Sequence, residues 1–296
     1  LLVTDVEKHV PAARELIDRF RFIPDWRIDD LMISYAPEGG SVGPHTDAYD
    51  VFLIQTHGQR RWMLNQDFDD TCLQGIELRI LEHFTAAEDW TLDPGDMLYL
   101  PPNVAHYGIA LNDCMTCSVG FRAPSISNLV SEYAENLAAN IDQALRYEDP
   151  DLVCQQSPAE ISPDALKTIR SIIAEQLTLD DDRLLRWFGE FSSESRSGLD
   201  TQSPEISLSS YDELAASLTA ESIIVQSPAA KFLFARNNDT ALLFVDGTCY
   251  AASLAFARAL TDKREINALR LIESVDGQAD QQTLLELYNR GCVLVP

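Results

Sequence analysis

The sequence lacks any apolar run that approaches the roughly 18 residues a membrane-spanning helix needs, and its apolar stretches are as short as "ALLFV" at 241–245. It also lacks a basic segment followed by an apolar one, so no signal peptide is predicted. Neither a membrane protein nor a membrane-bound partner is therefore expected.

Basic residues are scarce: 22 lysines and arginines stand against 47 acidic residues, which gives a net charge of −25. The excess of acid holds along the chain, with 9 basic and 20 acidic residues in 1–122, 6 and 15 in 123–200, and 7 and 12 in 201–296. We expect no direct binding of nucleic acid, because no part offers a phosphate-tracking surface. The acidic surface either keeps the protein soluble or attracts basic polypeptides.

The six cysteines show no disulfide-like framework, which suits a reducing compartment and predicts a cytoplasmic protein. Cys114 and Cys117 form a C-x-x-C within the strand-like segment "CMTCSVGF". Residues three apart in a strand face opposite ways, so this pair predicts ordinary strand packing and no metal or redox site.

A composition of 46% hydrophobic and 23% charged residues is typical of a globular protein, and 296 residues suffice for two or three units. Three units are predicted. The first, 1–122, has a helix at 12–22 and then short strands between proline- and glycine-rich turns, a pattern typical of an all-β sandwich or barrel. Its strands are expected at 27–35, 51–56, 60–64, 96–100, 105–111 and 116–122.

The second unit, 123–200, has helical periodicity at 125–146, 162–178 and 182–196. Its apolar faces could form a dimer or pack on the unit's own barrel. The third unit, 201–296, combines a hairpin with helices and predicts a small winged-helix-like α+β domain. The elements expected there are helices near 211–219, 253–261, 264–275 and 281–290, with the hairpin "KFLFAR" and "TALLFV".

The stretch "GPHTDAYD" places His45 and Asp47 two residues apart after a glycine-rich segment. In an extended strand both side chains point to the same face. A second stretch, "DPGDMLYLPPNVAHYG" at 93–108, supplies a tight turn, a buried strand and then His106. Two histidines and one aspartate form the facial triad that holds Fe(II) and leaves open positions for O₂ and a bidentate co-substrate.

Other metal sites fit less well. Cupin-type dioxygenases commonly present H-x-H and a glutamate, and a structural zinc needs a closed tetrahedral shell, often with cysteine. His9, His57 and His83 lack comparable settings and are expected to be solvated. We therefore predict His45, Asp47 and His106 as a three-ligand iron site.

A 2-oxoglutarate enzyme also needs a cation for the distal carboxylate of that co-substrate. In "GQRRWML", Arg60 shares a strand face with Trp62 and Leu64, whereas Arg61 lies on the other face. The more apolar face is expected to point inward, and the fork of a buried arginine suits a carboxylate. Arg60 is thus the predicted anchor, the alternative being two surface arginines on an edge strand.

These residues resemble a known family. The segments "PDWRIDDLMISY", "GGSVGPHTDAYDVFLIQ", "GQRRW", "DPGDMLYLPPNVAH" and "SVGFRAPS" are similar to the Jumonji-C (cupin-like) ribosomal oxygenases, in particular the bacterial arginine hydroxylases of the YcfD, or RoxA, type. The resemblance is dense over 24–124 and beyond that rests on architecture. It implies a double-stranded β-helix, a helical dimerisation region giving a homodimer, and a winged helix. Family chains begin earlier, so it also implies an N-terminal portion of the catalytic domain before Leu1.

The resemblance further implies an Fe(II)- and 2-oxoglutarate-dependent protein hydroxylase that uses O₂. Its partner would be a basic substrate, large-subunit ribosomal protein sixteen, hydroxylated at an arginine β-carbon. His45, Asp47 and His106 match the iron ligands, and Arg60 matches the co-substrate arginine. Thr116 stands where some relatives have an asparagine near the co-substrate.

By the same resemblance, Asp30, Met32 and Tyr49 match positions that line the substrate-arginine pocket. A carboxylate for the guanidinium and a thioether and an aromatic ring for the stem suit that ligand. The alternative makes Asp30 a surface acid and Met32 a core residue. Two other functions stay open at this point: an N-methyl demethylase with the same iron chemistry, and a non-catalytic cupin binding module.

Overall fold

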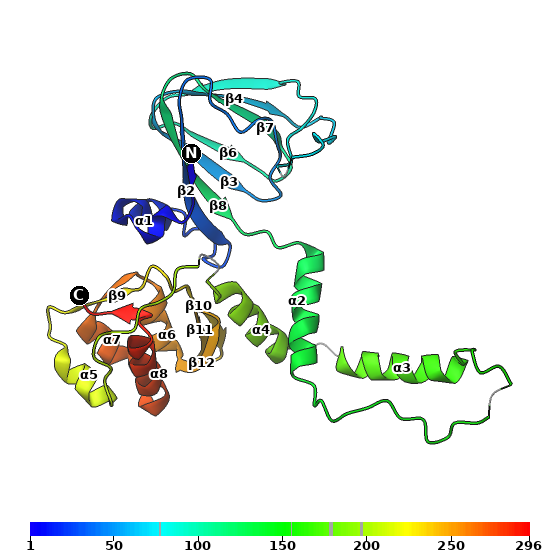
Figure 1. The fold of residues 1–296 in the computed structure, drawn as a ribbon. Coiled ribbons are helices and arrows are strands. Elements are labelled where there is room, and N and C mark those ends of the chain that lie inside the picture. Colours follow the sequence, from blue (N-terminus) through cyan, green and yellow to red (C-terminus); the bar gives the residue numbers. More distant parts are fainter. Residues whose placement is uncertain (77, 155, 178–179, 196–197) are drawn as a thin grey trace.

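The computed structural model describes residues 1–296 apart from 77, 155, 178–179 and 196–197. The chain forms a β-barrel, then a region of three helices, and then a small α+β domain (Figure 1). None of the described helices is both long and apolar enough to cross a membrane.

The barrel consists of two facing antiparallel sheets. One has five strands in the order β1-β2-β8-β3-β6, and the other has three in the order β5-β4-β7. The strands are β1 (Leu2–Val3), β2 (Ile28–Ala36), β3 (Val51–His57), β4 (Arg60–Asn65), β5 (Glu88–Leu92), β6 (Met97–Leu100), β7 (Ala105–Ala110) and β8 (Cys114–Phe121).

The chain crosses from the larger sheet to the smaller one at Gly58, which has a φ of +60°. A Cβ atom at this position would lie 2.1 Å from the carbonyl oxygen of Asp113, so only glycine fits the crossing. The turn lets β4 follow β3 after only two residues and brings Arg60 into the barrel wall.

Alternating residues of the larger sheet point to its two opposite faces and pack into two separate buried clusters. Inward-facing Val51 and Leu53 join residues of the smaller sheet in one buried cluster, Val51, Leu53, Trp62, Leu64, Leu92, Leu100 and Val104. On the outer face, helix α1 (Pro11–Asp18) and the short helix η1 (Val6–Lys8) cover Leu31, Val119 and Phe121. Because both faces are covered, the sheet is a rigid wall for whatever lies inside the barrel.

Three helices follow the barrel: α2 (Ile126–Ala139), α3 (Pro163–Gln176) and α4 (Asp181–Ser193). The side-chain oxygens of Ser125, Ser162 and Asp180 accept the backbone N–H three residues on, which caps each helix start. Helix α3 has no buried residue and projects away from both domains (Figure 1).

The C-terminal domain packs helices around two three-stranded sheets and a core centred on Leu243, Phe256 and Leu284. One sheet has the order β10-β11-β12 and the other β13-β9-β14. Its elements are α5 (Tyr211–Ser217), β9 (Ile223–Gln226), β10 (Phe232–Asn237), β11 (Thr240–Val245), β12 (Thr248–Ser253), α6 (Leu254–Thr261), β13 (Glu265–Asn267), α7 (Ala268–Ser274), α8 (Gly277–Asn289) and β14 (Val293–Leu294).

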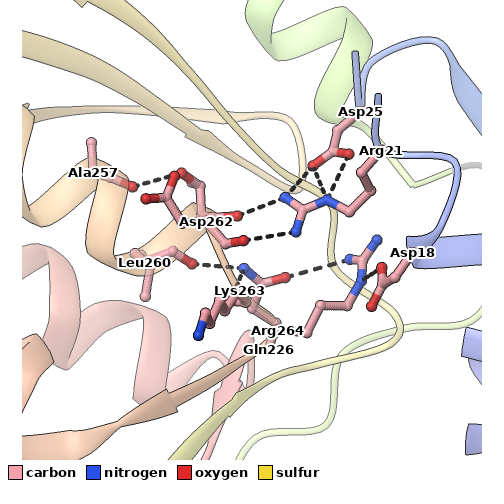
Figure 2. Close-up of polar contacts among 10 residues, drawn as sticks. Asp18, Arg21, Asp25, Gln226, Ala257, Leu260, Asp262, Lys263 and Arg264 are labelled. Carbon is pink, nitrogen blue, oxygen red and sulfur yellow. Dashed lines mark hydrogen bonds and ion pairs between the residues drawn. The ribbon is translucent and has the colours of Figure 1, made fainter. Parts of the chain in front are cut away.

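Cations of the barrel bind backbone carbonyls of the C-terminal domain (Figure 2). Arg21 Nη1 and Nη2 donate to the carbonyl oxygens of Asp262 and Thr261 at 2.9 and 2.8 Å, while Asp25 holds the same guanidinium. In the reverse direction, Arg264 Nε donates to Asp18 at 2.6 Å. These contacts fix the two domains against each other through the end of α1.

The expected barrel strands agree with the observed ones to within one or two residues, and the hairpin does as well. Four expected elements are wrong in part. The first helix ends at Asp18, the helix from 125 ends at Ala139, and 265–267 form strand β13 before α7 begins at Ala268. The helix expected at 281–290 is α8, which begins at Gly277. The helix ends expected at 178 and 196 lie outside the described residues.

Strand β5 was not expected, because four of its five residues are exposed and the sequence "EDWTL" has no apolar alternation. It forms through backbone pairing with β4, in which Trp90 lies opposite Trp62.

The two cysteines of the C-x-x-C, Cys114 and Cys117, lie in strand β8 and belong to different buried clusters. Cys117 is part of the cluster beneath α1.

Lys231 makes the stability of the domain interface depend on pH. Its Nζ donates to the Ile28 carbonyl oxygen at 2.6 Å, and burial lowers its pKa to about 7. Between pH 7 and 10 the unfolded chain therefore binds more protons than the folded one, so this residue makes stability rise with pH. We expect Lys231→Met to remove up to about 1.4 kcal/mol of that rise per pH unit.

The measurement is thermal unfolding of Lys231→Met and of the unmodified protein at pH 7 to 10, which gives the change of stability with pH for each. Lys263→Met on the same domain is the control, and its pH profile should follow that of the unmodified protein. Parallel profiles for Lys231→Met and the unmodified protein would contradict the assignment.

Candidate active site

His45 and His106 are brought together by backbone pairing. His45 N donates to the carbonyl oxygen of His106 at 3.0 Å, and His106 N donates to that of His45 at 2.9 Å. This reciprocal pair adds His45 to the free edge of β7, so the two imidazole centroids lie 4.2 Å apart.

Asp47 completes the cluster from the loop that leads into β3. Its Oδ2 lies 3.6 Å from Nε2 of His106, and the ligand atoms of His45, Asp47 and His106 all lie within 4.8 Å of one another. One ion can contact all three, because metal–ligand distances of roughly 2.0–2.2 Å place ligand atoms about 3–4 Å apart. The Asp47 carbonyl oxygen also accepts a bond from Asn103 N at 2.8 Å, which anchors the loop.

Both imidazoles have a defined ligand nitrogen. Nδ1 of His45 lies 2.9 Å from the carbonyl oxygen of Gly43, and Nδ1 of His106 lies 3.0 Å from that of Val104. Nδ1–H donation to these carbonyls leaves both Nε2 atoms as acceptors for a metal. Burial lowers the pKa of His106, which favours the neutral form that a ligand needs.

A cavity of about 800 Å³ opens beside this cluster and extends through the barrel to α2 and α4. Arg60, on β4, forms part of its wall and is only 7% exposed. Its Nη1 donates to the hydroxyl of Ser34 at 3.2 Å, and its Nε finds no hydrogen-bond partner in the described part of the chain. Among the described residues no carboxylate forms an ion pair with Arg60, so its buried charge is available to an anion.

Arg61 has the opposite orientation. It lies on the outer face of β4, where its guanidinium forms an exposed ion pair with Asp89. The face assignment made from the sequence is thus the one observed, and Arg61 is not among the residues that line the cavity.

Asp30, Met32 and Tyr49 all line the same cavity. Asp30 and Met32 share the inner face of β2, and Tyr49 follows Asp47 in the loop. Burial raises the pKa of Asp30. Partial burial and the Asp47 carboxylate raise the pKa of Tyr49 to about 12, so its hydroxyl stays protonated.

Thr116 lies deeper than expected and does not line the cavity. It is fully buried, and its hydroxyl donates to Gln55 Oε1 at 2.9 Å. Ser118, two residues along the same face of β8, does line the cavity. His9, His57 and His83 are exposed and lie outside the metal-binding cluster.

Sequence reasoning assigned no functional role to several residues of the cavity wall, among them Ser34 and Trp62. Both had a usable signal, because Ser34 shares the strand face of Asp30 and Met32, and Trp62 shares that of Arg60. Neither residue type suggests a ligand by itself, since a buried serine or tryptophan is usually a packing residue.

Two family models match the chain: the JmjC domain over residues 15–129 and the ROXA-like winged helix over residues 174–293. Among curated proteins, the ribosomal protein uL16 3-hydroxylase of Escherichia coli is 42% identical over 199 residues, 67% of this chain and 52% of that protein. A probable ribosomal oxygenase of Haemophilus influenzae is 41% identical over 51% of this chain and 36% of its own length. The chain thus spans about half or less of the curated relatives it matches.

Solved structures extend the match over the whole chain. A crystal structure of E. coli YcfD has a TM-score of 0.86 at 32% identity and matches 100% of this chain and 78% of its own. The structure of E. coli YcfD in complex with cobalt and 2-oxoglutarate has a TM-score of 0.80 at 33% identity, over 99% and 77% of the two chains. The chain belongs to the YcfD-type ribosomal oxygenases, a family that joins a JmjC catalytic domain to a ROXA-like winged helix.

Proposed function

We propose that this protein is an Fe(II)- and 2-oxoglutarate-dependent hydroxylase of an arginine β-carbon in large-subunit ribosomal protein sixteen. The observation that carries the proposal is the three-ligand cluster beside a cavity lined by the buried Arg60, which pairs with no carboxylate among the residues that the structure describes. The name of the E. coli relative and the cobalt and 2-oxoglutarate bound to YcfD support it.

In this proposal His45, Asp47 and His106 hold Fe(II). Two imidazole nitrogens and one carboxylate oxygen are a donor set that suits ferrous iron and leaves positions open. The bound metal would supply O₂ activation coupled to decarboxylation of the co-substrate. The chain's own part is to fix these ligands through the backbone pair of His45 and His106 and the carbonyl bonds to both Nδ1 atoms.

Arg60 then binds the distal carboxylate of 2-oxoglutarate, with Ser34 fixing the position of its guanidinium. The proposed substrate contacts are Asp30, which would pair with the substrate guanidinium, and Met32 and Tyr49 along its stem. The acidic chain favours a basic ribosomal protein as partner. Thr116 supports the barrel next to this site through Gln55, and we assign it no direct contact with 2-oxoglutarate.

Product mass is the direct test of the reaction. Incubation with Fe(II), 2-oxoglutarate and an arginine-containing peptide of the ribosomal protein should add one oxygen to the peptide and yield succinate. Asp47→Ala should reduce product to the background without enzyme, because it removes one metal ligand, whereas the exposed Asp113→Ala should not.

The same assay separates the alternatives. Loss of a methyl group from a methylated peptide, without oxygen gain on the arginine, would identify a demethylase. Absence of both succinate and modified peptide would contradict the enzymatic proposal and favour a binding module.

Arg60 and Arg61 form a matched pair for testing the co-substrate site. Arg60→Met should raise the KM for 2-oxoglutarate by at least about 100-fold, since loss of one partner of a buried charge pair costs roughly 3–5 kcal/mol. Arg61→Met should change it by less than about twofold, because its exposed ion pair contributes little. Equal effects of the two variants would rule out Arg60 as the anchor.

We also propose that the helical region forms a homodimer. A groove of about 680 Å³ between α2 and α4 is lined almost entirely by apolar residues. Tyr133 OH is buried there and has no hydrogen-bond partner among the described residues. On α3, Leu166, Ile169 and Ile173 are 55%, 42% and 51% exposed on one helix face. An apolar groove and an apolar helix face exposed on the same region complement each other in a two-fold pair.

Replacing Ile169 and Ile173 together by aspartate should shift the protein from dimer to monomer, because it places charge on this apolar face. Sedimentation velocity measures the shift. Ser171→Asp, on the opposite face of α3, is the control and should stay dimeric. A monomeric unmodified protein would contradict the proposal.

The cellular setting and the domain boundaries stay predictions. A ribosomal substrate and the buried thiols of Cys114, Cys117 and Cys292 support a cytoplasmic protein. The division at residues 122 and 200 is proposed for the catalytic, helical and winged-helix units. For the acidic winged helix we propose a role in protein contact instead of nucleic-acid binding.

A further inference from the structure

Strand β2 contains a β-bulge at the point where it reaches the cavity. Its register with β8 shifts between Ile28 and Leu31. Asp29 and Asp30 therefore stand together opposite the single residue Gly120 of β8. Ile28 and Leu31 both pack in the buried cluster beneath α1, whereas Asp30 lines the cavity. In an unbroken strand residues 28 and 30 would share a face, so the bulge is what turns the Asp30 side chain into the cavity.

The short helix η1 holds this bulge from the side of β1. Tyr35 N donates to the carbonyl oxygen of Leu1, and the N–H of Leu31 points the same way because it lies four residues earlier in the strand. Strand β1 ends at Val3, and beyond it the Glu7 carboxylate takes the place of a strand carbonyl. Glu7 Oε2 accepts the Leu31 N–H at 2.9 Å. Without this acceptor the N–H would lose its partner beside a fully buried side chain, which is unfavourable.

The start of the same helix contacts Asp30 directly. Asp5, the residue that precedes η1, donates its backbone N–H to Asp30 Oδ2 at 3.3 Å. Asp30 Oδ1 lies over the backbone of Gly120, where an added Cβ atom would be 3.5 Å away. The bulge and η1 thus place both carboxylate oxygens, and Glu7 is the side chain that joins η1 to the bulge.

Asp30 has no cation of its own, unlike two acids beside it. Asp5, Asp29 and Asp30 all line the cavity. Lys8 Nζ lies 2.6 Å from Asp5, and Arg122 Nε donates to Asp29 at 3.0 Å. Asp30 forms no ion pair among the residues that the structure describes. Burial and the nearby carboxylates raise the pKa of Asp30, so a cation that arrives beside it is favoured.

We propose that Glu7 is a positioning residue for the substrate: it fixes the bulge in β2 and thereby the direction of Asp30, which selects a guanidinium side chain. This inference rests on the proposed function, in which Asp30 pairs with the substrate arginine, and adds the residue that maintains this preference. Glu7 does not line the catalytic cavity, so it acts through Asp30 and not by contact with the substrate.

Two peptides that differ by one charge test this role. They carry either the substrate arginine or citrulline, whose neutral urea group has nearly the shape of a guanidinium. Calorimetry measures their binding to the protein loaded with Zn(II) and 2-oxoglutarate. The unmodified protein should bind the arginine peptide at least about 10-fold more tightly. Glu7→Met keeps the length of the stem and removes the acceptor. It should weaken binding of the arginine peptide by about 10-fold and of the citrulline peptide by less than about twofold.

Two further variants separate positioning from general destabilisation. Glu7→Gln keeps an oxygen that can accept the Leu31 N–H and should retain the preference for arginine. Val6→Ala is the matched control, because Val6 is the neighbouring residue of η1, is 8% exposed and packs beneath α1. It should lower the Tm and leave the preference unchanged. If Glu7→Met does not fold, Glu7→Asp replaces it, since its shorter stem withdraws the carboxylate from Leu31.

A double-mutant cycle shows whether Glu7 acts through Asp30. Asp30→Asn should weaken binding of the arginine peptide by itself, and adding Glu7→Met to it should change binding by less than about twofold. Amide hydrogen exchange gives a readout that needs no ligand. Exchange of the Leu31 N–H should be about 10-fold faster in Glu7→Met and unchanged in Glu7→Gln.

The possible outcomes separate this inference from the proposed function. Equal weakening of both peptides by Glu7→Met, additive effects of Glu7→Met and Asp30→Asn, or no rescue by Glu7→Gln would overturn the positioning role alone. If the unmodified protein binds the two peptides equally, the proposed contact between Asp30 and the substrate guanidinium fails first and the positioning role with it.

Discussion

The site depends on one pair of reciprocal backbone hydrogen bonds, those between His45 and His106. The two residues are 61 positions apart, and the pair is what places their rings 4.2 Å from each other. Asp47 follows two residues later, so the same pair also determines where the carboxylate can lie. A shift of one residue in this register would turn the His106 side chain to the other face of β7 and so separate it from His45 and Asp47.

The architecture around this pair serves to hold it. Gly58 turns the chain from one sheet to the other, and α1 covers the outer face of the larger sheet. The interface through Arg21 and Arg264 then fixes the C-terminal domain to the end of α1 (Figure 2). The cavity thereby has rigid walls on the barrel side and reaches the helical region at its mouth.

The features of the barrel and the site that depend on the pattern within one short segment were predictable from the sequence. Alternation along "RRWML" separated Arg60 from Arg61, and the spacing of His45 and Asp47 indicated a shared direction. What the sequence could not show depends on pairing between distant segments. Strand β5 forms by pairing with β4 despite its polar sequence, and the Thr116 hydroxyl donates a hydrogen bond to Gln55.

The central claim is that three side chains hold one ferrous ion and leave positions open for a keto acid. X-ray absorption at the iron edge of the Fe(II)-loaded protein with 2-oxoglutarate tests it most directly. The account predicts a six-coordinate shell of nitrogen and oxygen that contains two imidazoles and a chelating keto acid. A four-coordinate ion, a sulfur ligand, or a shell that does not change when the keto acid is added would contradict it.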